Sequence, residues 1–239
     1  MMRAHGFAAG LVATALSCCL WAGGAAAGAP EAAQVPTRTA LAARTPLGGS
    51  WGTANQHEAR AALSTAKLYL ADYALRHGDG AEDDRALAER MIRYSDDAAA
   101  DKLAAKYPGA IDAVAAEYGL TATSGGASWG MSWTSAADLA DFLCATTTSD
   151  PGSPILGWMR AAGAVAADGT VQDWGTARLP GVRGTKWGWA DRGTAAEVAS
   201  ASFGDGFTIA AITYGSPDDQ TTDVVTAATD IHDGPLGYR

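Results

Sequence analysis

The sequence is short of cysteine and of clustered histidine, and each shortage removes a class of structure or chemistry. Of its three cysteines, Cys18 and Cys19 lie in an apolar run at the N-terminus. If that run is a removable leader, Cys144 remains alone and no intramolecular disulfide can form. The histidines are scattered without the spacing of metal ligands, so we expect no metal and no other cofactor. Stability must therefore come from a hydrophobic core.

Positive charge is also scarce: 17 Lys and Arg stand against 26 Asp and Glu, so the formal net charge is -9. Such a surface disfavours nucleic acid and anionic membranes as partners. We expect a monomer whose partner is a small-molecule or peptide substrate. Only four of the 17 basic residues are lysines, at positions 67, 102, 106 and 186.

The N-terminus has the form of an export signal. Arg3 supplies positive charge, the following apolar run is too short for a permanent anchor, and the small residues of 25–29 offer cleavage sites, of which Pro30 disfavours the later one. We therefore predict a signal peptide over residues 1–27, cleavage after Ala27 and a secreted or extracytoplasmic protein without a stable membrane anchor. An uncleaved anchor is the alternative. The composition then predicts a linker over residues 28–48 and one domain over residues 49–239.

The order of the predicted elements favours an α+β fold. Helical periodicity occurs over residues 58–76, 82–94, 97–107, 109–118, 135–146, 154–163 and 221–231. Strand patterns occur late, over residues 181–190, 194–203 and 206–214, with hairpin turns near 191–193 and 204–206. Few strand signals precede the first helix, so we expect a small sheet. The pattern predicts a helical lobe beside an antiparallel sheet.

The most informative pattern is Ser64-Thr65-Ala66-Lys67. Residues three apart share one face of a helix, so the Ser64 hydroxyl and the Lys67 amine can touch. Serine is a weak nucleophile until a base takes its proton, and a desolvated lysine can be that base. On its own, the pattern also fits an exposed helical turn.

Two further patterns follow in the chain, Ser95-Asp96-Asp97 and Lys186-Trp187-Gly188. Together the three patterns resemble the Ser-x-x-Lys, Ser-x-Asn and Lys-Thr-Gly motifs of the penicillin-binding protein and class A β-lactamase superfamily. The resemblance covers roughly residues 58–230. It implies a β-lactamase-like fold, with an antiparallel sheet flanked by helices, a small helical lobe and an active site between the lobes.

The resemblance also implies roles for individual residues. Ser64 would attack an amide or β-lactam carbonyl, Lys67 would take its proton, and Ser95 would relay a proton to the leaving nitrogen. Lys186 would attract a substrate carboxylate, and Gly188 would let the strand approach the substrate. The oxyanion hole would be formed by the backbone N–H groups of Ser64 and Trp189.

Two residues of the predicted substrate-binding set depart from the superfamily pattern. Asp97 replaces an asparagine, and an ionised carboxylate accepts hydrogen bonds but cannot donate them. We expect Asp97 to lie beside Lys67 or Lys186 as a counter-charge and to raise the pKa of that lysine. Trp187 replaces a threonine or serine whose hydroxyl binds the substrate carboxylate.

The third departure is an absence. Class A β-lactamases carry a glutamate between the second and third motifs that activates the deacylating water. Here the stretch between Gly119 and Trp133 contains no Asp or Glu. The sequence therefore favours an exported serine acyl-enzyme hydrolase for D-Ala-type cell-wall peptides or β-lactams. A catalytically impaired binding or structural protein and a class A-like β-lactamase are the alternatives.

Overall fold

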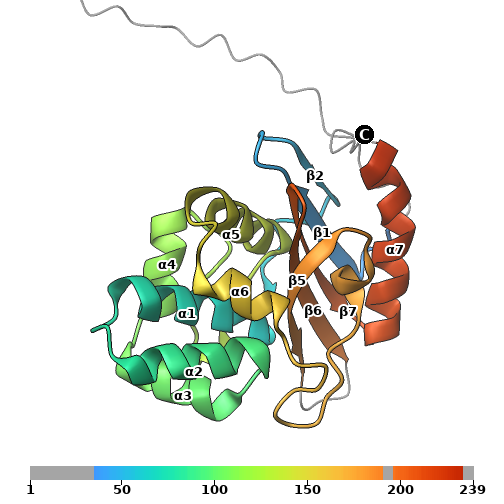
Figure 1. The fold of residues 1–239 in the computed structure, drawn as a ribbon. Coiled ribbons are helices and arrows are strands. Elements are labelled where there is room, and N and C mark those ends of the chain that lie inside the picture. The colour runs from blue at the N-terminus through green and yellow to red at the C-terminus, as the bar shows by residue number, and fades with distance from the viewer. Residues whose placement is uncertain (1–34, 191–195, 234–239) are drawn as a thin grey trace, which may run out of the picture.

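The computed structural model describes residues 35–190 and 196–233, so the predicted signal peptide and the predicted turn at 191–193 lie outside the described residues. The described chain forms a five-stranded antiparallel sheet with helices on both faces (Figure 1). The strand order is β2-β1-β7-β6-β5. The strands are β1 (Thr39–Arg44), β2 (Ser50–Gly52), β5 (Val182–Trp189), β6 (Glu197–Gly204) and β7 (Phe207–Tyr214). The α+β prediction is confirmed.

The predicted linker over residues 28–48 is wrong for β1, which lies inside the sheet. β1 pairs with β2 on one side and β7 on the other. Its run from Thr39 to Ala43 is buried on both faces of the sheet, so small apolar residues follow one another without polar alternation. That composition resembles a linker in the sequence. The folded domain therefore begins before residue 49, and the sheet is larger than expected.

The helices agree closely with the periodicity, apart from the first. They are α1 (Ala66–His77), α2 (Glu82–Arg93), α3 (Asp97–Lys106), α4 (Ala110–Tyr118), α5 (Ala136–Ser149), α6 (Pro154–Arg160) and α7 (Pro217–Asp233). Three short 3₁₀ turns are η1 (Leu63–Thr65), η2 (Trp129–Met131) and η3 (Gly175–Arg178). Two short strands, β3 (Arg60–Ala61) and β4 (Trp133–Thr134), pair with each other.

The predicted helix over residues 58–76 is wrong in its first part. This part is occupied by β3 and η1, and α1 begins only at Ala66. The reason is tertiary: Arg60 pairs with Thr134 across the small sheet, and the Ala62 N–H donates to the Ser132 carbonyl. These contacts hold the chain extended just before η1.

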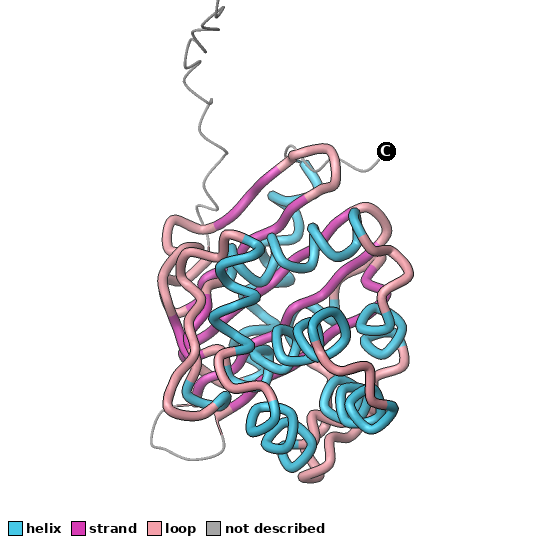
Figure 2. The backbone as a smooth tube through the Cα atoms, turned by 90° about the vertical axis from the view of Figure 1, so that its left-hand side faces the viewer, coloured by secondary structure: helices cyan, strands magenta, loops and turns pink. Residues whose placement is uncertain are grey.

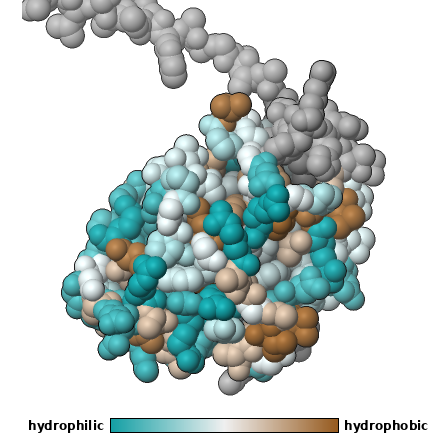
Figure 3. Space-filling view, in the orientation of Figure 1, coloured by the Kyte–Doolittle hydropathy of each residue, from teal (hydrophilic) through white to brown (hydrophobic). Residues whose placement is uncertain are grey.

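Two hydrophobic clusters cover the two faces of the sheet. The larger one joins α1, α2, α3, α4, α5 and α6 to one face, and the smaller one lies under α7 on the other. Figure 2 shows the larger group of helices lying across the strands. In Figure 3 the visible surface is mostly hydrophilic or intermediate, with hydrophobic residues in scattered patches. No described helix is both long enough and apolar enough to cross a membrane.

Phe142 on α5 lies at the centre of the larger cluster. It is fully buried, and its ring centroid is 5.1 Å from those of both Tyr69 and Tyr118. We predict that Phe142→Ala lowers the free energy of unfolding by about 3–5 kcal/mol, because the lost contacts leave a cavity. Leu47→Ala is the control, since Leu47 is 98% exposed. Equilibrium urea unfolding measures both, and equal small losses would contradict the central role of Phe142.

Candidate active site

Ser64 lies in the 3₁₀ turn η1, immediately before α1. The preceding Leu63 has φ 51°, a left-handed conformation that is strained for leucine. The Thr65 hydroxyl hydrogen-bonds to the Ala62 carbonyl and holds the turn together. The turn thus presents the Ser64 hydroxyl at the entrance to α1, where it faces the side chain of Lys67.

Lys67 is the fully buried centre of the site. Its Nζ donates to Ser64 Oγ at 2.9 Å and lies 3.2 Å from Ser95 Oγ. It also donates to the Ser95 carbonyl at 2.7 Å and to Asp97 Oδ1 at 2.5 Å. A buried ammonium is tolerated only when it is paired and hydrogen-bonded, and Lys67 meets both conditions. Asp97 lies beside Lys67 as a counter-charge, as predicted.

Ser95 occupies the junction of α2 and α3, with φ 51°. The next residue, Asp96, caps α3 by accepting a hydrogen bond from Ala99 N at 3.0 Å. Burial pushes the pKa of Asp96 upward, but hydrogen bonds from Arg90 and Ala99 outweigh it and leave the pKa lowered. The ionised cap fixes the junction and therefore the direction of the Ser95 hydroxyl.

Lys186 reaches the same hydroxyl from the sheet. It is 0% exposed in the middle of β5, and its Nζ lies 2.9 Å from Ser95 Oγ and 2.8 Å from the Trp187 carbonyl. Burial lowers the pKa of Lys186 well below its usual value; the charge of Lys67 acts in the same direction, and Asp97 opposes it. Ser64, Lys67, Ser95 and Lys186 thus form one connected chain of polar groups.

Gly188 lets the sheet approach the serine. A Cβ at this position would lie 2.8 Å from both Leu63 Cβ and Ser64 N, closer than real side chains allow. β5 therefore packs its backbone directly against η1, which only glycine permits here. The next residue, Trp189, lines the same pocket as Ser64.

The pocket in front of Ser64 has a volume of about 240 Å³ and a markedly acidic wall. It is lined by Ser64, Ser95, Asp96, Asp97, Ala98, Ala167, Asp168 and Trp189. Lys186 does not line the pocket and reaches it only through Ser95. In the described part of the chain, no group of three or more His, Cys, Asp or Glu side chains is placed to hold a metal ion.

The side chain of Trp187 does not line this pocket, although its motif placed it in the predicted substrate-binding set. It is 7% exposed, and its Nε1 donates to the Trp174 carbonyl at 3.0 Å. The indole packs in a separate cluster with Trp174 and Val198. Strand alternation explains the difference, because neighbouring residues of β5 point to opposite faces of the sheet. Lys186 points toward the face covered by α1 to α6, and Trp187 points toward the opposite face.

Two residues near the site were not found from the sequence. Trp129, in the loop before β4, lies with its ring centroid 4.5 Å from Lys67 Nζ, and its Nε1 donates to Asp101 Oδ1 at 2.7 Å. Asp168 lies in the segment after α6 and accepts from Trp189 Nε1 at 3.2 Å. For Trp129, the only signal in the sequence is the tryptophan content of residues 121–133, which otherwise have the composition of a loop. The sequence gives no such signal for Asp168.

Asp168 adds negative charge to the pocket. Burial raises the pKa of Asp168, but hydrogen bonds from the backbone and side chain of Thr170 and from Trp189 outweigh it and lower the pKa overall. Its carboxylate is therefore ionised at neutral pH. The ring of Trp129 covers Lys67, whereas Asp97 and Asp168 line the pocket in front of Ser64.

Comparison with solved structures assigns the fold. A β-lactamase from Chitinophaga pinensis DSM 2588 matches with a TM-score of 0.63 and 15% identity, over 84% of this chain and 95% of that one. A β-lactamase from Streptomyces albus G matches with a TM-score of 0.63 and 16% identity, over 80% and 93% of the two chains. No protein-family model matches the sequence, and no curated protein matches it.

A third matching structure is a penicillin-binding protein. Penicillin-binding protein D2 from Listeria monocytogenes, with ampicillin bound, matches with a TM-score of 0.58 and 15% identity, over 80% of this chain and 95% of that one. The protein therefore has the fold that β-lactamases and penicillin-binding proteins share. The fold agrees with the resemblance that its three motifs carry.

The lowered pKa of Lys186 predicts a pH-dependent contribution to stability. Between this lowered value and 10.5, the unfolded chain binds more protons at this residue than the folded one, so stability rises with pH. The free energy of unfolding of the wild type should therefore rise with pH relative to that of Lys186→Met. The ratio of the wild-type folding constant to that of Lys186→Met can rise by at most about tenfold per pH unit.

Urea unfolding of both proteins across the alkaline range measures this difference. Lys102→Met, at an exposed lysine, controls for the loss of a surface charge. A difference between wild type and Lys186→Met that stays flat or falls with rising pH would show that Lys186 is charged in the folded protein.

Proposed function

We propose that the protein is an exported serine acyl-enzyme hydrolase of the penicillin-binding protein and β-lactamase type, acting through Ser64. The observation that carries this proposal is the 2.9 Å contact between Lys67 Nζ and Ser64 Oγ at the edge of an open pocket. The second support is the continuation of this contact through Ser95 to Lys186. A serine joined to two buried amines has the means to lose its proton.

The proposed reaction begins with attack of Ser64 Oγ on an amide, ester or β-lactam carbonyl carbon. The Ser64 proton moves to Lys67 as the carbon–oxygen bond forms. Because Asp97 favours the charged form of Lys67, Lys67 must first pass a proton on. Neutral Lys186 can receive this proton through Ser95 Oγ, but its lowered pKa makes the transfer unfavourable, which slows acylation.

Collapse of the tetrahedral intermediate then breaks the bond to the leaving group. Ser95 Oγ, which lies near both amines, returns a proton to the leaving nitrogen. The backbone N–H groups of Ser64 and Trp189 are proposed to stabilise the oxyanion. The tight packing of Gly188 against Ser64 N supports the closeness of these two amides. Water finally hydrolyses the acyl-serine.

The proposed substrates are cell-wall peptides ending in D-alanine, or β-lactams, and the proposed location is outside the cytoplasm. Penicillin-binding protein D2, a structural neighbour, holds ampicillin. The proposed domain covers the described sheet and helices. Removal of the N-terminal signal after Ala27 belongs to the same proposal.

One observation favours the first alternative function, and another disfavours the second. The ion pair between Asp97 and Lys67 favours a catalytically impaired binding protein, because it stabilises the protonated amine. A class A-like β-lactamase is disfavoured by Trp129, whose ring covers Lys67 from the loop where that class carries its glutamate. We therefore expect an acyl-enzyme that forms slowly and persists.

The labelling of Ser64 tests the proposal. Incubation with a β-lactam or an activated fluorophosphonate should add one adduct mass to the protein, seen by intact mass spectrometry. Ser64→Ala should abolish the adduct, because the nucleophile is lost. Lys67→Ala should slow labelling by about 100-fold or more, the usual contribution of a general base. Ser149→Ala, at an exposed serine on α5, is the matched control and should label like the wild type.

Two outcomes would overturn parts of the proposal. Absence of any adduct on the wild type, with both reagents, would favour the binding protein. Sustained hydrolysis of a chromogenic cephalosporin over many equivalents, lost in Ser64→Ala, would restore the β-lactamase alternative and refute slow deacylation.

The role of Asp97 gives a separate prediction. Asp97→Asn removes the counter-charge from Lys67, so Ser64 should be acylated about tenfold faster or more, the effect of one pKa unit on a base. Asp168→Asn removes a negative charge from the same pocket without a described bond to Lys67 and should change the rate less than twofold. Stopped labelling reactions analysed by mass spectrometry give both rates. An unchanged or slower rate in Asp97→Asn would refute the counter-charge role.

A further inference from the structure

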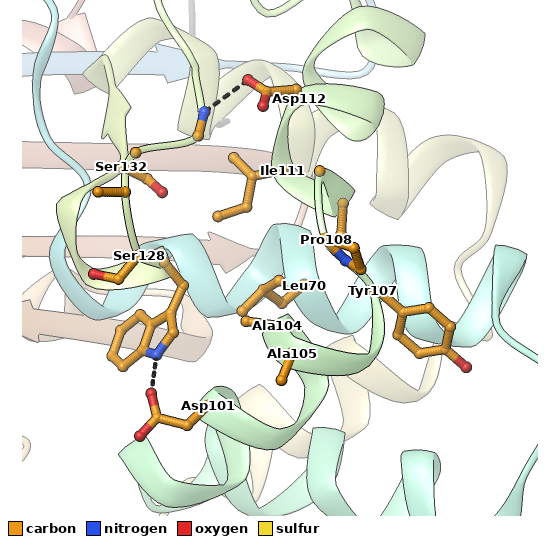
Figure 4. A pocket seen from close by; sticks show the side chains of 16 residues that line it. Leu70, Asp101, Ala104, Ala105, Tyr107, Pro108, Ile111, Asp112, Ser128 and Ser132 are labelled. Atoms are coloured by element: carbon orange, nitrogen blue, oxygen red, sulfur yellow. Dashed lines mark hydrogen bonds between the residues drawn. The ribbon is translucent and has the colours of Figure 1, made fainter.

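A second pocket lies apart from the Ser64 pocket, beneath the loop that carries Trp129. Its volume is about 360 Å³, and it is enclosed by α1, the end of α3, the start of α4 and the segment 125–129 with Ser132 (Figure 4). No step of the proposed reaction uses it. We therefore considered which ligand the lining of this pocket could bind.

Most of the wall is apolar. Leu70 and Ile111 are buried on opposite sides of the space, and Ala104, Ala105 and Pro108 complete the surface between them. The wall comes from three helices and a loop that are all held by the larger hydrophobic cluster. A cavity of this size and composition accommodates the apolar body of a small organic molecule.

One buried polar group in this wall lacks a partner. Ser132 is 1% exposed, and within the described residues its Oγ makes no hydrogen bond. Its backbone is fixed, because its N–H donates to the Trp129 carbonyl and its carbonyl accepts from Ala62 N. In Figure 4 the Ser132 side chain points into the pocket. Buried hydroxyls are normally satisfied, so this one marks a polar contact point for a ligand.

The formal charge of the wall is entirely negative. Asp101 and Asp112 line the pocket, whereas no Lys, Arg or His is among its lining residues. Asp101 Oδ1 accepts from Trp129 Nε1 and Asp112 Oδ1 accepts from Gly125 N, both at 2.7 Å. Within the described chain, the other oxygen of each carboxylate has no hydrogen bond. The adjacent end of α3 and start of α4 contribute opposite partial charges, which offset each other.

We propose that this pocket binds a small organic ammonium ion with an apolar body. The body occupies the space between Leu70 and Ile111, the nitrogen donates a hydrogen bond to Ser132 Oγ, and the two carboxylates at the ends of the pocket attract its positive charge. An anion of the same shape is excluded, because it would face Asp101 and Asp112 without a compensating cation.

Occupation of the pocket is sensed at the Ser64 site through Trp129. The indole lines the pocket, and its ring centroid lies 4.5 Å from Lys67 Nζ. A ligand that contacts this indole or competes for Asp101 shifts the ring relative to the ammonium. Binding itself does not depend on whether Ser64 is catalytic, so the proposal stands or falls separately from the proposed function.

An NMR titration with three probes of similar shape tests the proposal. Benzylammonium should produce saturable shifts of the amide signals of Gly125, Ser128 and Ile111, together with a shift of the Trp129 indole signal. Benzyl alcohol should bind more weakly, and benzoate at least tenfold more weakly than benzylammonium. Equal binding of benzoate would refute the charge assignment. Shifts confined to Ser64, Asp168 and Trp189 would place the ammonium in the other pocket and refute the site.

Two variants and a control separate binding from general perturbation. Ala104→Phe fills the pocket from α3 and should abolish the benzylammonium shifts. Ser132→Ala removes the contact point with little change in volume and should weaken binding at least fivefold. Ala116→Phe adds the same ring at an exposed site on α4 outside the pocket and should bind like the wild type. Unchanged affinity in both pocket variants would overturn the proposal.

Discussion

The buried ammonium group of Lys67 is the point at which separate parts of this fold meet. It contacts the turn before α1, the junction between α2 and α3, and the first residue of α3, all within hydrogen-bonding distance. A charge with no exposed surface cannot tolerate the loss of these partners, since water does not replace them. The relative positions of η1, α1 and the Ser95 junction are therefore set by electrostatics as much as by hydrophobic packing.

The two buried lysines constrain each other through Ser95. Both amines lie within 3.2 Å of one hydroxyl, and only Lys67 has a carboxylate beside it. Asp97 forms an ion pair with Lys67, whereas burial lowers the pKa of Lys186. The site therefore holds two amines in different electrostatic surroundings on either side of one hydroxyl. A sequence with so few lysines keeps half of them in this arrangement.

Local patterns predicted much of this protein. The helices from α2 to α7 and the strands β5, β6 and β7 follow the periodicities of their own residues. The candidate site residues were found because three motifs, spread over about 120 residues in all, each carry a chemically specific side chain. Motif position and charge predicted Asp97 beside Lys67 or Lys186, and in the structure it lies beside Lys67.

Features that depend on tertiary contacts could not be predicted in the same way. β1 is an alanine-rich segment that is buried only because β2, β7 and the helices surround it. The orientation of Trp187 depends on which face of β5 packs against α1 to α6. Trp129 reaches Lys67 from a loop without a periodic pattern, and Asp168 reaches Trp189 from another such loop.

The left-handed backbone of Leu63 has a consequence for how this protein tolerates change. Leucine in this conformation stores strain that glycine would release, yet its side chain is buried against the core. Thermal robustness and a rigidly held Ser64 hydroxyl therefore make opposite demands at one position. A relaxed backbone here would gain conformational freedom in the segment that aims the hydroxyl of Ser64. Leu63 thus sets backbone strain against the fixed direction of a neighbouring hydroxyl, although its own side chain does not line the pocket.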